Sequence, residues 1–146
     1  MGNKAGAEAL KVVLADTFTL YLKTLNYHWN VESPNFLALH LMFEGQYQEL
    51  ATAVDDIAER IRALGEKAPA TFSAYSGLSS MSEGDCNASG TAMVKDLAES
   101  QIAMDQSLSA ALKVAQAAED EGTIALLDDR IRSHEKTAWM LRSSAV

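Results

Sequence analysis

Four long stretches of the chain repeat apolar residues at steps of three and four, and this spacing limits the fold more than any other feature. Such a repeat indicates a helix with one buried stripe, and heptad-like spacing is typical of helices packed near-parallel in a bundle. No stretch alternates as a strand would. The sequence therefore predicts an all-α four-helix bundle, with stripes at Leu10, Val13, Leu14, Thr17, Tyr21 and Leu25; Phe36, Leu39, Phe43, Tyr47, Leu50, Val54, Ile57, Ile61 and Leu64; Val94, Leu97, Gln101, Met104, Leu108, Ala111 and Ala115; and Ile124, Leu127, Ile131, His134, Ala138 and Leu141.

The connection between the second and third helices is too long for a hairpin loop. Gly65 predicts the end of the second helix, and Gly122 predicts a tight break between the third and fourth. A crossover from Glu66 to about Ser89 lets the third helix run in the same direction as the second. Apolar residues every three positions within it predict a short extra helix, namely Phe72, Tyr75, Leu78 and Met81. We expect residues 1–146 to form one domain.

Composition narrows the range of partners and compartments. The net charge of −8 repels phosphate, and the N-terminal residues carry no lysine-rich arm, so direct DNA binding is not favoured. No apolar run reaches the roughly 18 to 20 residues that cross a bilayer, and no secretory signal is visible. The lone Cys86 suits a reducing compartment. We expect a cytoplasmic protein without membrane contact.

Five residues of the first two helices are candidate metal ligands: His28, His40, Glu44, Asp55 and Glu59. Imidazole and carboxylate ligands suit iron or manganese and require no thiolate. At about 100° per residue, the four on the second helix lie on one shoulder beside its apolar stripe. However, fifteen residues separate His40 from Asp55, about 22 Å at ~1.5 Å per residue, so one chain cannot bring both to a single ion.

A second copy of the chain removes this difficulty. In two copies of the second helix packed antiparallel about a two-fold axis, facing residues have numbers with a constant sum. His40 with Glu59 gives 99, and Glu44 with Asp55 gives the same sum. An isologous dimer with its axis near Leu50 would therefore place each imidazole end against a carboxylate end of the partner, forming two identical sites.

Simpler explanations exist for several of these residues. The acids could form a solvated face, with Glu59 paired to Arg60 or Arg62. A lone histidine on an apolar face is more often a core residue than a ligand, and this is the interpretation we adopt for His134, which has no carboxylates arranged around it.

Three motifs stand out in the first two helices, namely HWN at 28–30, PNFxxxH at 34–40 and DxIAERI at 55–61. They closely resemble motifs of the Dps family, the DNA-binding proteins from starved cells, and the segment HEKTAWMLR at 134–142 is also similar to that family. Together with the helix order, the resemblance spans nearly the whole chain. It implies a ferritin-like four-helix bundle that assembles into a hollow homo-oligomer, a dodecamer built from two-fold dimers.

The resemblance also implies an activity, oxidation of Fe(II) with hydrogen peroxide at intersubunit sites holding two iron ions, and storage of the ferric mineral. The family's ligands map onto His28, His40, Asp55 and Glu59, and the acid after the second histidine maps onto Glu44, where many members carry aspartate. Trp29 resembles a family tryptophan near the site that could quench stray oxidant, or it could serve packing alone. Removing iron and peroxide would protect DNA without contact.

The chain departs from the family at its expected iron entry pore. Ala125 stands where many relatives have an aspartate, and the acids left for that role are Glu121, Asp128 and Asp129.

Other functions remain open. A bacterioferritin-type site inside one bundle needs Glu-x-x-His motifs, and no glutamate here has histidine three places later. A nucleoid or structural shell protein with an inactive metal site is the alternative, and a helical interaction module leaves the clustered ligands unexplained.

Overall fold

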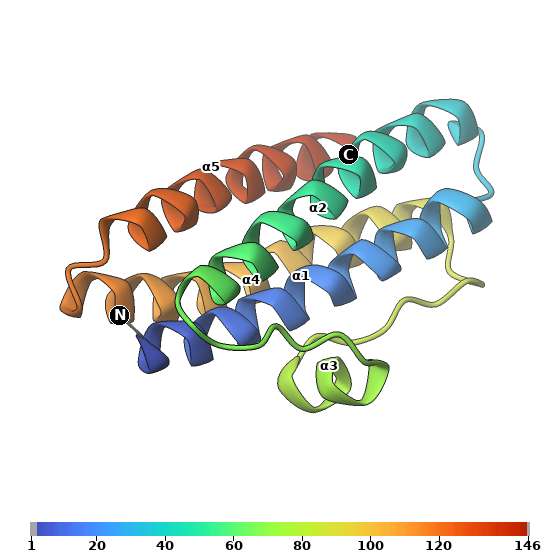
Figure 1. Ribbon diagram of the computed structural model, residues 1–146. Helices are drawn as coiled ribbons and strands as arrows, with labels where there is room; N and C mark the ends of the chain where they lie inside the picture. The colour runs from blue at the N-terminus through green and yellow to red at the C-terminus, as the bar shows by residue number, and fades with distance from the viewer. Residues whose placement is uncertain (1–2, 146) are drawn as a thin grey trace.

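The computed structural model describes residues 3–145, which form four long helices and one short one. The helices are α1 (Lys4–Asn30), α2 (Phe36–Ala63), α3 (Phe72–Leu78), α4 (Gly90–Ala117) and α5 (Glu121–Ser144). Figure 1 shows α2 and α4 running in one direction and α1 and α5 in the other. Because the long crossover makes α2 and α4 parallel, the predicted all-α bundle with its extra helix is confirmed. Within residues 3–145 no helix is long and apolar enough to span a membrane.

The helix ends are set by capping residues, and the tight break between α4 and α5 comes just before the glycine that was predicted to mark it. At the starts of four helices a backbone N–H donates to the side-chain oxygen of the capping residue, which is Asn3, Thr71, Ser89 or Asp120. Gly65 takes a φ of 97° directly after α2, as expected of a glycine that ends a helix. The turn between α4 and α5 instead bends at Glu119, with a φ of 53°, and Gly122 lies inside α5. A Cβ at Gly122 would lie 2.8 Å from the Arg60 guanidinium, so close approach explains this glycine.

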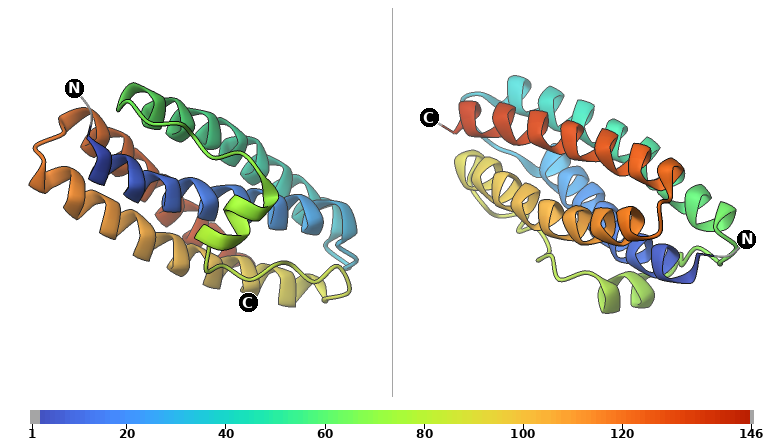
Figure 2. Two further views of the ribbon diagram at one scale, coloured as in Figure 1. Left: turned by 60° about the horizontal axis from the view of Figure 1, so that its bottom comes forward. Right: turned by 90° about the vertical axis from the view of Figure 1, so that its left-hand side faces the viewer.

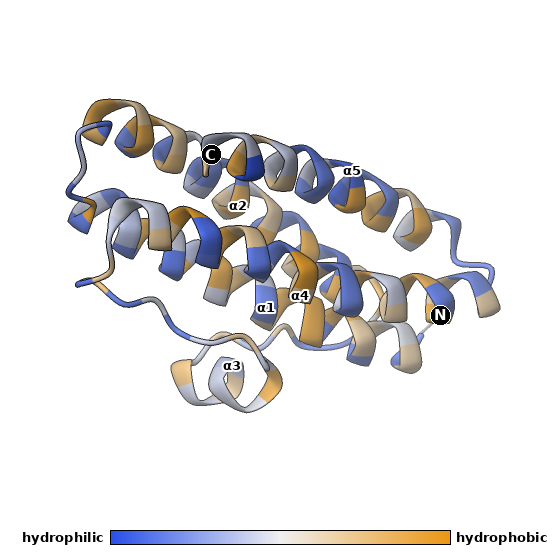
Figure 3. Cartoon of the chain, turned by 180° about the vertical axis from the view of Figure 1, so that it is seen from behind, coloured by the Kyte–Doolittle hydropathy of each residue, from blue (hydrophilic) through white to orange (hydrophobic). Residues whose placement is uncertain are grey.

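The predicted stripes form the core. All seven stripe residues of α4 are buried, and Phe43, Ile57 and Ile61 of α2 are fully enclosed. Figure 3 shows hydrophobic and hydrophilic residues alternating along each helix, as one-sided burial requires. Burying one such large apolar side chain stabilises the fold by about 1.5–3 kcal/mol. Phe36 departs from the expected stripe, since 43% of its surface is exposed.

The crossover is fixed to the outside of the bundle, where Figure 2 shows α3 beside α1. Tyr75 of α3 packs on Phe18 of α1 with ring centroids 4.8 Å apart. Further along, Ser82 of the crossover accepts a hydrogen bond from the buried Lys23 at 3.3 Å, and the same ammonium donates to Ser100 of α4 at 2.9 Å and pairs with Asp96 at 3.3 Å. Lys23 therefore links the crossover, α1 and α4 at one point, shortly before α4 begins.

Candidate metal centre

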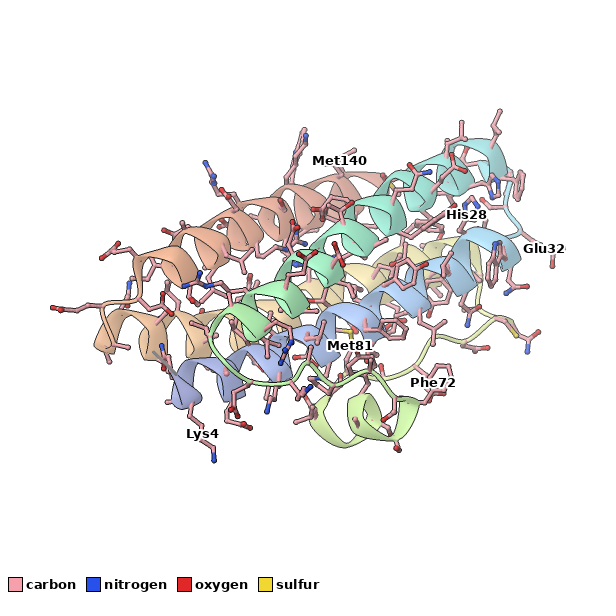
Figure 4. The ribbon with its side chains drawn as sticks, viewed as in Figure 1. Lys4, His28, Glu32, Phe72, Met81 and Met140 are labelled. Atoms are coloured by element: carbon pink, nitrogen blue, oxygen red, sulfur yellow. The ribbon has the colours of Figure 1, made fainter. Side chains whose placement is uncertain are left out.

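His28 and His40 lie together where α1 ends and α2 begins, and Figure 4 shows His28 in the last turns of α1. Their rings stack with centroids 3.8 Å apart and an interplanar angle of 13°. Nδ1 of His28 lies 2.8 Å from the backbone oxygen of His40, and Nδ1 of His40 lies 2.7 Å from that of His28. A carbonyl only accepts, so both Nδ1 atoms donate. In an imidazole whose only proton is on Nδ1, Nε2 carries the lone pair that can bind a metal.

Two aromatic rings complete the surroundings of the histidine pair. Phe36 stacks on His40 with centroids 5.0 Å apart, and Tyr47 meets His28 edge-on at 5.1 Å. Their place in the predicted core stripe gave no indication of this contact. The spacing of Phe36 and His40, one helical turn apart, was the available signal for the first. Nothing in the sequence indicated the second, because it joins residues of different helices.

A short turn holds the two histidine-bearing helices against each other. Val31 is buried directly after α1, and its N–H donates to the Tyr27 carbonyl. Ser33 then accepts from two backbone N–H groups, through its hydroxyl from Asn35 and through its carbonyl from Phe36. The chain thus reverses within five residues, 31–35, so the last turn of α1 faces the first turns of α2.

The predicted carboxylates lie further along α2. Glu44 is half-buried one turn after His40, whereas Asp55 and Glu59 are exposed. Asp55 raises the pKa of Glu59 above its usual value, first through a shared hydrogen bond and then through its negative charge. Two ionised carboxylates this close repel each other, and a bound cation would relieve that repulsion.

The basic residues near Glu59 are engaged elsewhere. Arg60 pairs with Asp120 at 2.7 Å and also donates to Thr123, and Arg62 donates to the Glu66 carbonyl at 3.0 Å. Among residues 3–145 no lysine or arginine forms an ion pair with Asp55 or Glu59. The expectation that Glu59 could be paired to Arg60 or Arg62 is therefore wrong within one chain.

One chain thus carries two separate halves of a site. The structure joins His28 with His40 and Asp55 with Glu59, but it does not join the two pairs. In the described part of the chain, no group of three or more histidine, cysteine, aspartate or glutamate residues could hold a metal ion. The role of the five predicted residues as ligands, and the two-fold packing that would complete their site, stay predictions.

His134 is a core residue, and both of its ring nitrogens are occupied. Nδ1 lies 2.6 Å from the Gln101 side-chain oxygen, and Nε2 accepts from Arg130 at 3.0 Å. Burial, followed by the charge of Arg130, lowers the pKa of His134 to about 3, so the ring is neutral. Arg130 in turn donates two hydrogen bonds to Glu49 of α2, at 2.5 Å and 3.0 Å. The four side chains connect α2, α4 and α5 without any role for a metal.

The remaining candidates lie on the surface. Trp29 is 66% exposed beside the histidine pair. The residues considered for an entry pore are all exposed on α5, namely Glu121, Ala125, Asp128 and Asp129, and Asp129 pairs with Arg132. Their assignment to a pore stays a prediction.

Comparison with known proteins defines the class to which this fold belongs. The model of the ferritin-like domain matches residues 7–145. Among solved structures, the Dps protein from Bacillus brevis superposes with a TM-score of 0.94 at 33% identity, covering 100% of both chains. Dps from Vibrio cholerae, described as a member of a superfamily of ferritin-like diiron-carboxylate proteins, has a TM-score of 0.94 at 32% identity and covers 98% of this chain and 90% of its own.

The curated relatives point to one branch of that class. DNA protection during starvation protein 2 of Bacillus anthracis is 39% identical over 141 residues, covering 97% of each chain. General stress protein 20U of Bacillus subtilis is 32% identical and covers 93% of this chain and 94% of its own. The chain belongs to the Dps family of ferritin-like proteins.

Proposed function

We propose that this protein oxidises Fe(II) with hydrogen peroxide at sites shared between two subunits and stores the ferric product in the cavity of a homo-oligomeric shell. The observation that carries the proposal is the histidine pair, whose reciprocal hydrogen bonds leave both Nε2 atoms available. The solved relative from Vibrio cholerae is described as a ferritin-like diiron-carboxylate protein, which supports iron as the substrate metal.

Each site takes its ligands from both subunits. His28, His40 and Glu44 of one subunit supply two imidazoles and a carboxylate, and Asp55 and Glu59 of the other supply two carboxylates. Mixed nitrogen and oxygen ligands of this kind suit ferrous iron. Two Fe(II) ions deliver two electrons to peroxide, and two protons complete two molecules of water, so no hydroxyl radical is released.

The proposed assembly is a dodecamer built from two-fold dimers in the bacterial cytoplasm. Dps-type neighbours and the half-sites of a single chain support assembly of identical subunits. Protection of DNA follows from removal of iron and peroxide and needs no direct contact, which a net charge of −8 per chain disfavours because it repels phosphate.

A complementation experiment tests the shared site. One variant carries His28→Ala and His40→Ala, and the other carries Asp55→Ala and Glu59→Ala. Each variant alone is loaded with Fe(II) anaerobically, and after peroxide is added it should oxidise the iron about 10- to 100-fold more slowly than wild type, or slower still. Changing only the partners of metal ligands already lowers activity by that factor. Co-refolded in equal amounts, the two should recover about a quarter of wild-type sites, because half of random dimers are mixed and each has one complete site.

The control is His134→Gln, which changes a histidine that contacts neither half-site and should keep wild-type oxidation. All variants are sized before and after loading, so that loss of the shell is separated from loss of the site. No recovery in a mixed shell of normal size would refute the shared site. Equally slow oxidation in wild type and both variants would instead favour a nucleoid or structural shell protein with an inactive metal site.

A cross-linking experiment tests the two-fold packing separately. Gln48 is exposed on α2 and, by the constant sum of 99, faces Ala51 of a second copy close to the axis. In a Cys86→Ser background, Gln48→Cys should form covalent dimers with a short bismaleimide. Gln106→Cys, exposed on α4 diagonally across the bundle, should remain monomeric on a denaturing gel, and the reverse pattern would exclude packing through α2.

A further inference from the structure

A groove of about 780 Å³ lies between α2 and α5, and the five candidate iron ligands lie outside it. Figures 1 and 2 show the two helices side by side, and Figure 4 shows Met140 on α5 next to α2. Towards one end of the groove, Arg130 of α5 pairs with Glu49 of α2. Towards the other end, the Ser144 hydroxyl lies 3.6 Å from the Met42 sulfur. A cavity of this size is typical of a small-molecule site.

The lining of the groove changes from apolar to polar along its length. We distinguish an apolar stretch, made of Ala38, Leu41, Met42 and Met140, from a polar end, made of Gln46, Glu49 and Lys136. The helices are antiparallel and meet at Glu49 and Arg130, so Gln46 and Lys136, one and two turns from that contact, come to the same end. The charge of Glu49 is balanced there by two hydrogen bonds from Arg130.

The polar end carries two donors that lack an acceptor. Lys136 is exposed and, within the described residues, forms no ion pair. The amide nitrogen of Gln46, Nε2, is buried and makes no hydrogen bond to another residue of 3–145. The last side-chain torsion of glutamine is soft, so this amide can turn into the groove. An ammonium and an amide at one end of a groove suit a carboxylate, which accepts from both.

Gly45 leaves the floor of the groove open down to the helix backbone. It is exposed inside α2 and lines the groove. A Cβ at this position would have no atom within 4 Å, so the packing of the described chain does not require a glycine. Glycine weakens the interior of a helix relative to alanine. A ligand that lies directly against the backbone accounts for its presence.

We propose that this groove binds a medium-chain monocarboxylate, with the carboxylate at the polar end and the hydrocarbon chain along the apolar stretch. From Ala38 to Gly45 the helix rises about 10 Å at ~1.5 Å per residue. An extended hydrocarbon chain advances about 1.25 Å per carbon–carbon bond of ~1.5 Å, so roughly eight carbons fill this length. The site shares no residue with the proposed iron ligands, and the inference does not rest on the ferroxidase function.

Other occupants fit the groove less well. A cation would meet the Lys136 ammonium, and Glu49 is already neutralised by Arg130. Ligands with several negative charges are disfavoured by the net charge of −8. A helix of a second copy is about 10 Å wide and cannot enter between α2 and α5, because contacts near both ends hold them within side-chain reach of each other.

Equilibrium dialysis of the assembled protein against radiolabelled octanoate measures the binding. We expect it to saturate at one octanoate per subunit. Affinity should rise about two- to fourfold per methylene from butyrate to octanoate, because a fully buried methylene contributes a factor of about four and the groove is open on one side. Chains longer than the apolar stretch should gain no further affinity.

Two lysine variants test the position of the carboxylate. Lys136→Met removes the charge and keeps most of the length of the side chain. It should weaken octanoate binding about three- to tenfold and leave the binding of octan-1-ol unchanged. Lys113→Met, which alters an exposed lysine of α4, should change neither. An equal loss of acid and alcohol in Lys136→Met would contradict a carboxylate at this end.

Gly45→Leu tests the groove itself, because it fills the apolar stretch from a position with open space around the new Cβ. It should abolish octanoate binding while the size of the assembly and the helix content stay as in wild type. Ala110→Leu, an exposed position of α4 outside the groove, should bind octanoate normally. Retained binding in Gly45→Leu, or binding that never saturates, would overturn the proposal. Failure of Gly45→Leu to assemble would overturn it in favour of a second copy as the occupant.

Discussion

His134 makes the stability of the bundle sensitive to mild acid. The folded chain holds the ring neutral, with a pKa lowered to about 3, whereas an unfolded histidine has its ordinary value of about 6.5. Because the unfolded chain binds the extra proton, this stability is fully present above about pH 6.5 and is lost progressively as the pH falls toward 3. Between pH 7 and pH 5 the loss should be about 2 kcal/mol in the free energy of unfolding.

The substitution His134→Gln isolates this effect, because glutamine can accept from Arg130 and donate to Gln101 without titrating. Urea unfolding of both proteins is measured at pH 7, 6 and 5 at one protein concentration, since assembly also contributes to stability. The difference between wild type and variant should shift by about 2 kcal/mol in favour of the variant at pH 5. Asp120, whose pKa is lowered, titrates below this range. Parallel losses in the two proteins would refute a neutral, buried His134.

Three further perturbations test other contacts. Glu49→Ala leaves the buried Arg130 guanidinium without its carboxylate and should lower the free energy of unfolding in urea by about 2 kcal/mol. This is less than the ~3–5 kcal/mol of a fully buried pair, because Glu49 is half exposed. Arg130→Met should cost less than Glu49→Ala, and the reverse order would contradict the stabilising role of the pair. Gly122→Ala should displace the Arg60 guanidinium, 2.8 Å from the new Cβ, and lower stability by about 1 kcal/mol despite alanine's better helix propensity. Excess Zn(II) should inhibit iron oxidation reversibly, because sites of nitrogen and oxygen ligands bind Zn(II) more tightly than Fe(II); unchanged rates in zinc would speak against these ligands.

The periodicity of the sequence was sufficient to predict the bundle, because burial of one helix face imposes the same spacing wherever a helix packs. All seven stripe residues predicted for α4 are buried, although Met93 and Ser100 outside the stripe are buried as well, and the 66–89 segment was long enough to reveal the parallel α2 and α4. Gly122 shows where such reasoning fails. A glycine near a helix boundary has two explanations, backbone conformation and lack of a side chain, and only the position of Arg60 distinguishes them.

The candidate ligands could be selected from the sequence as residue types, but their geometry could not be predicted. The spacing of His40, Glu44, Asp55 and Glu59 on α2 follows from helix periodicity, so their shared shoulder could be derived. The reciprocal hydrogen bonds of His28 and His40 could not, since they depend on the turn that brings α1 back against α2. That same turn determines which nitrogen of each ring is free.

Each half of the proposed site is held by contacts within its own chain, which separates folding from activity. Backbone carbonyls orient His28 and His40, and the Arg60–Asp120 pair fixes the end of α2 that carries Glu59 against α5. Neither set of contacts needs a metal or a second subunit. Under the proposed packing, dimer formation therefore completes the site without rearranging either chain. At subunit concentrations too low for dimers to form, the chain should remain folded but lose iron oxidation.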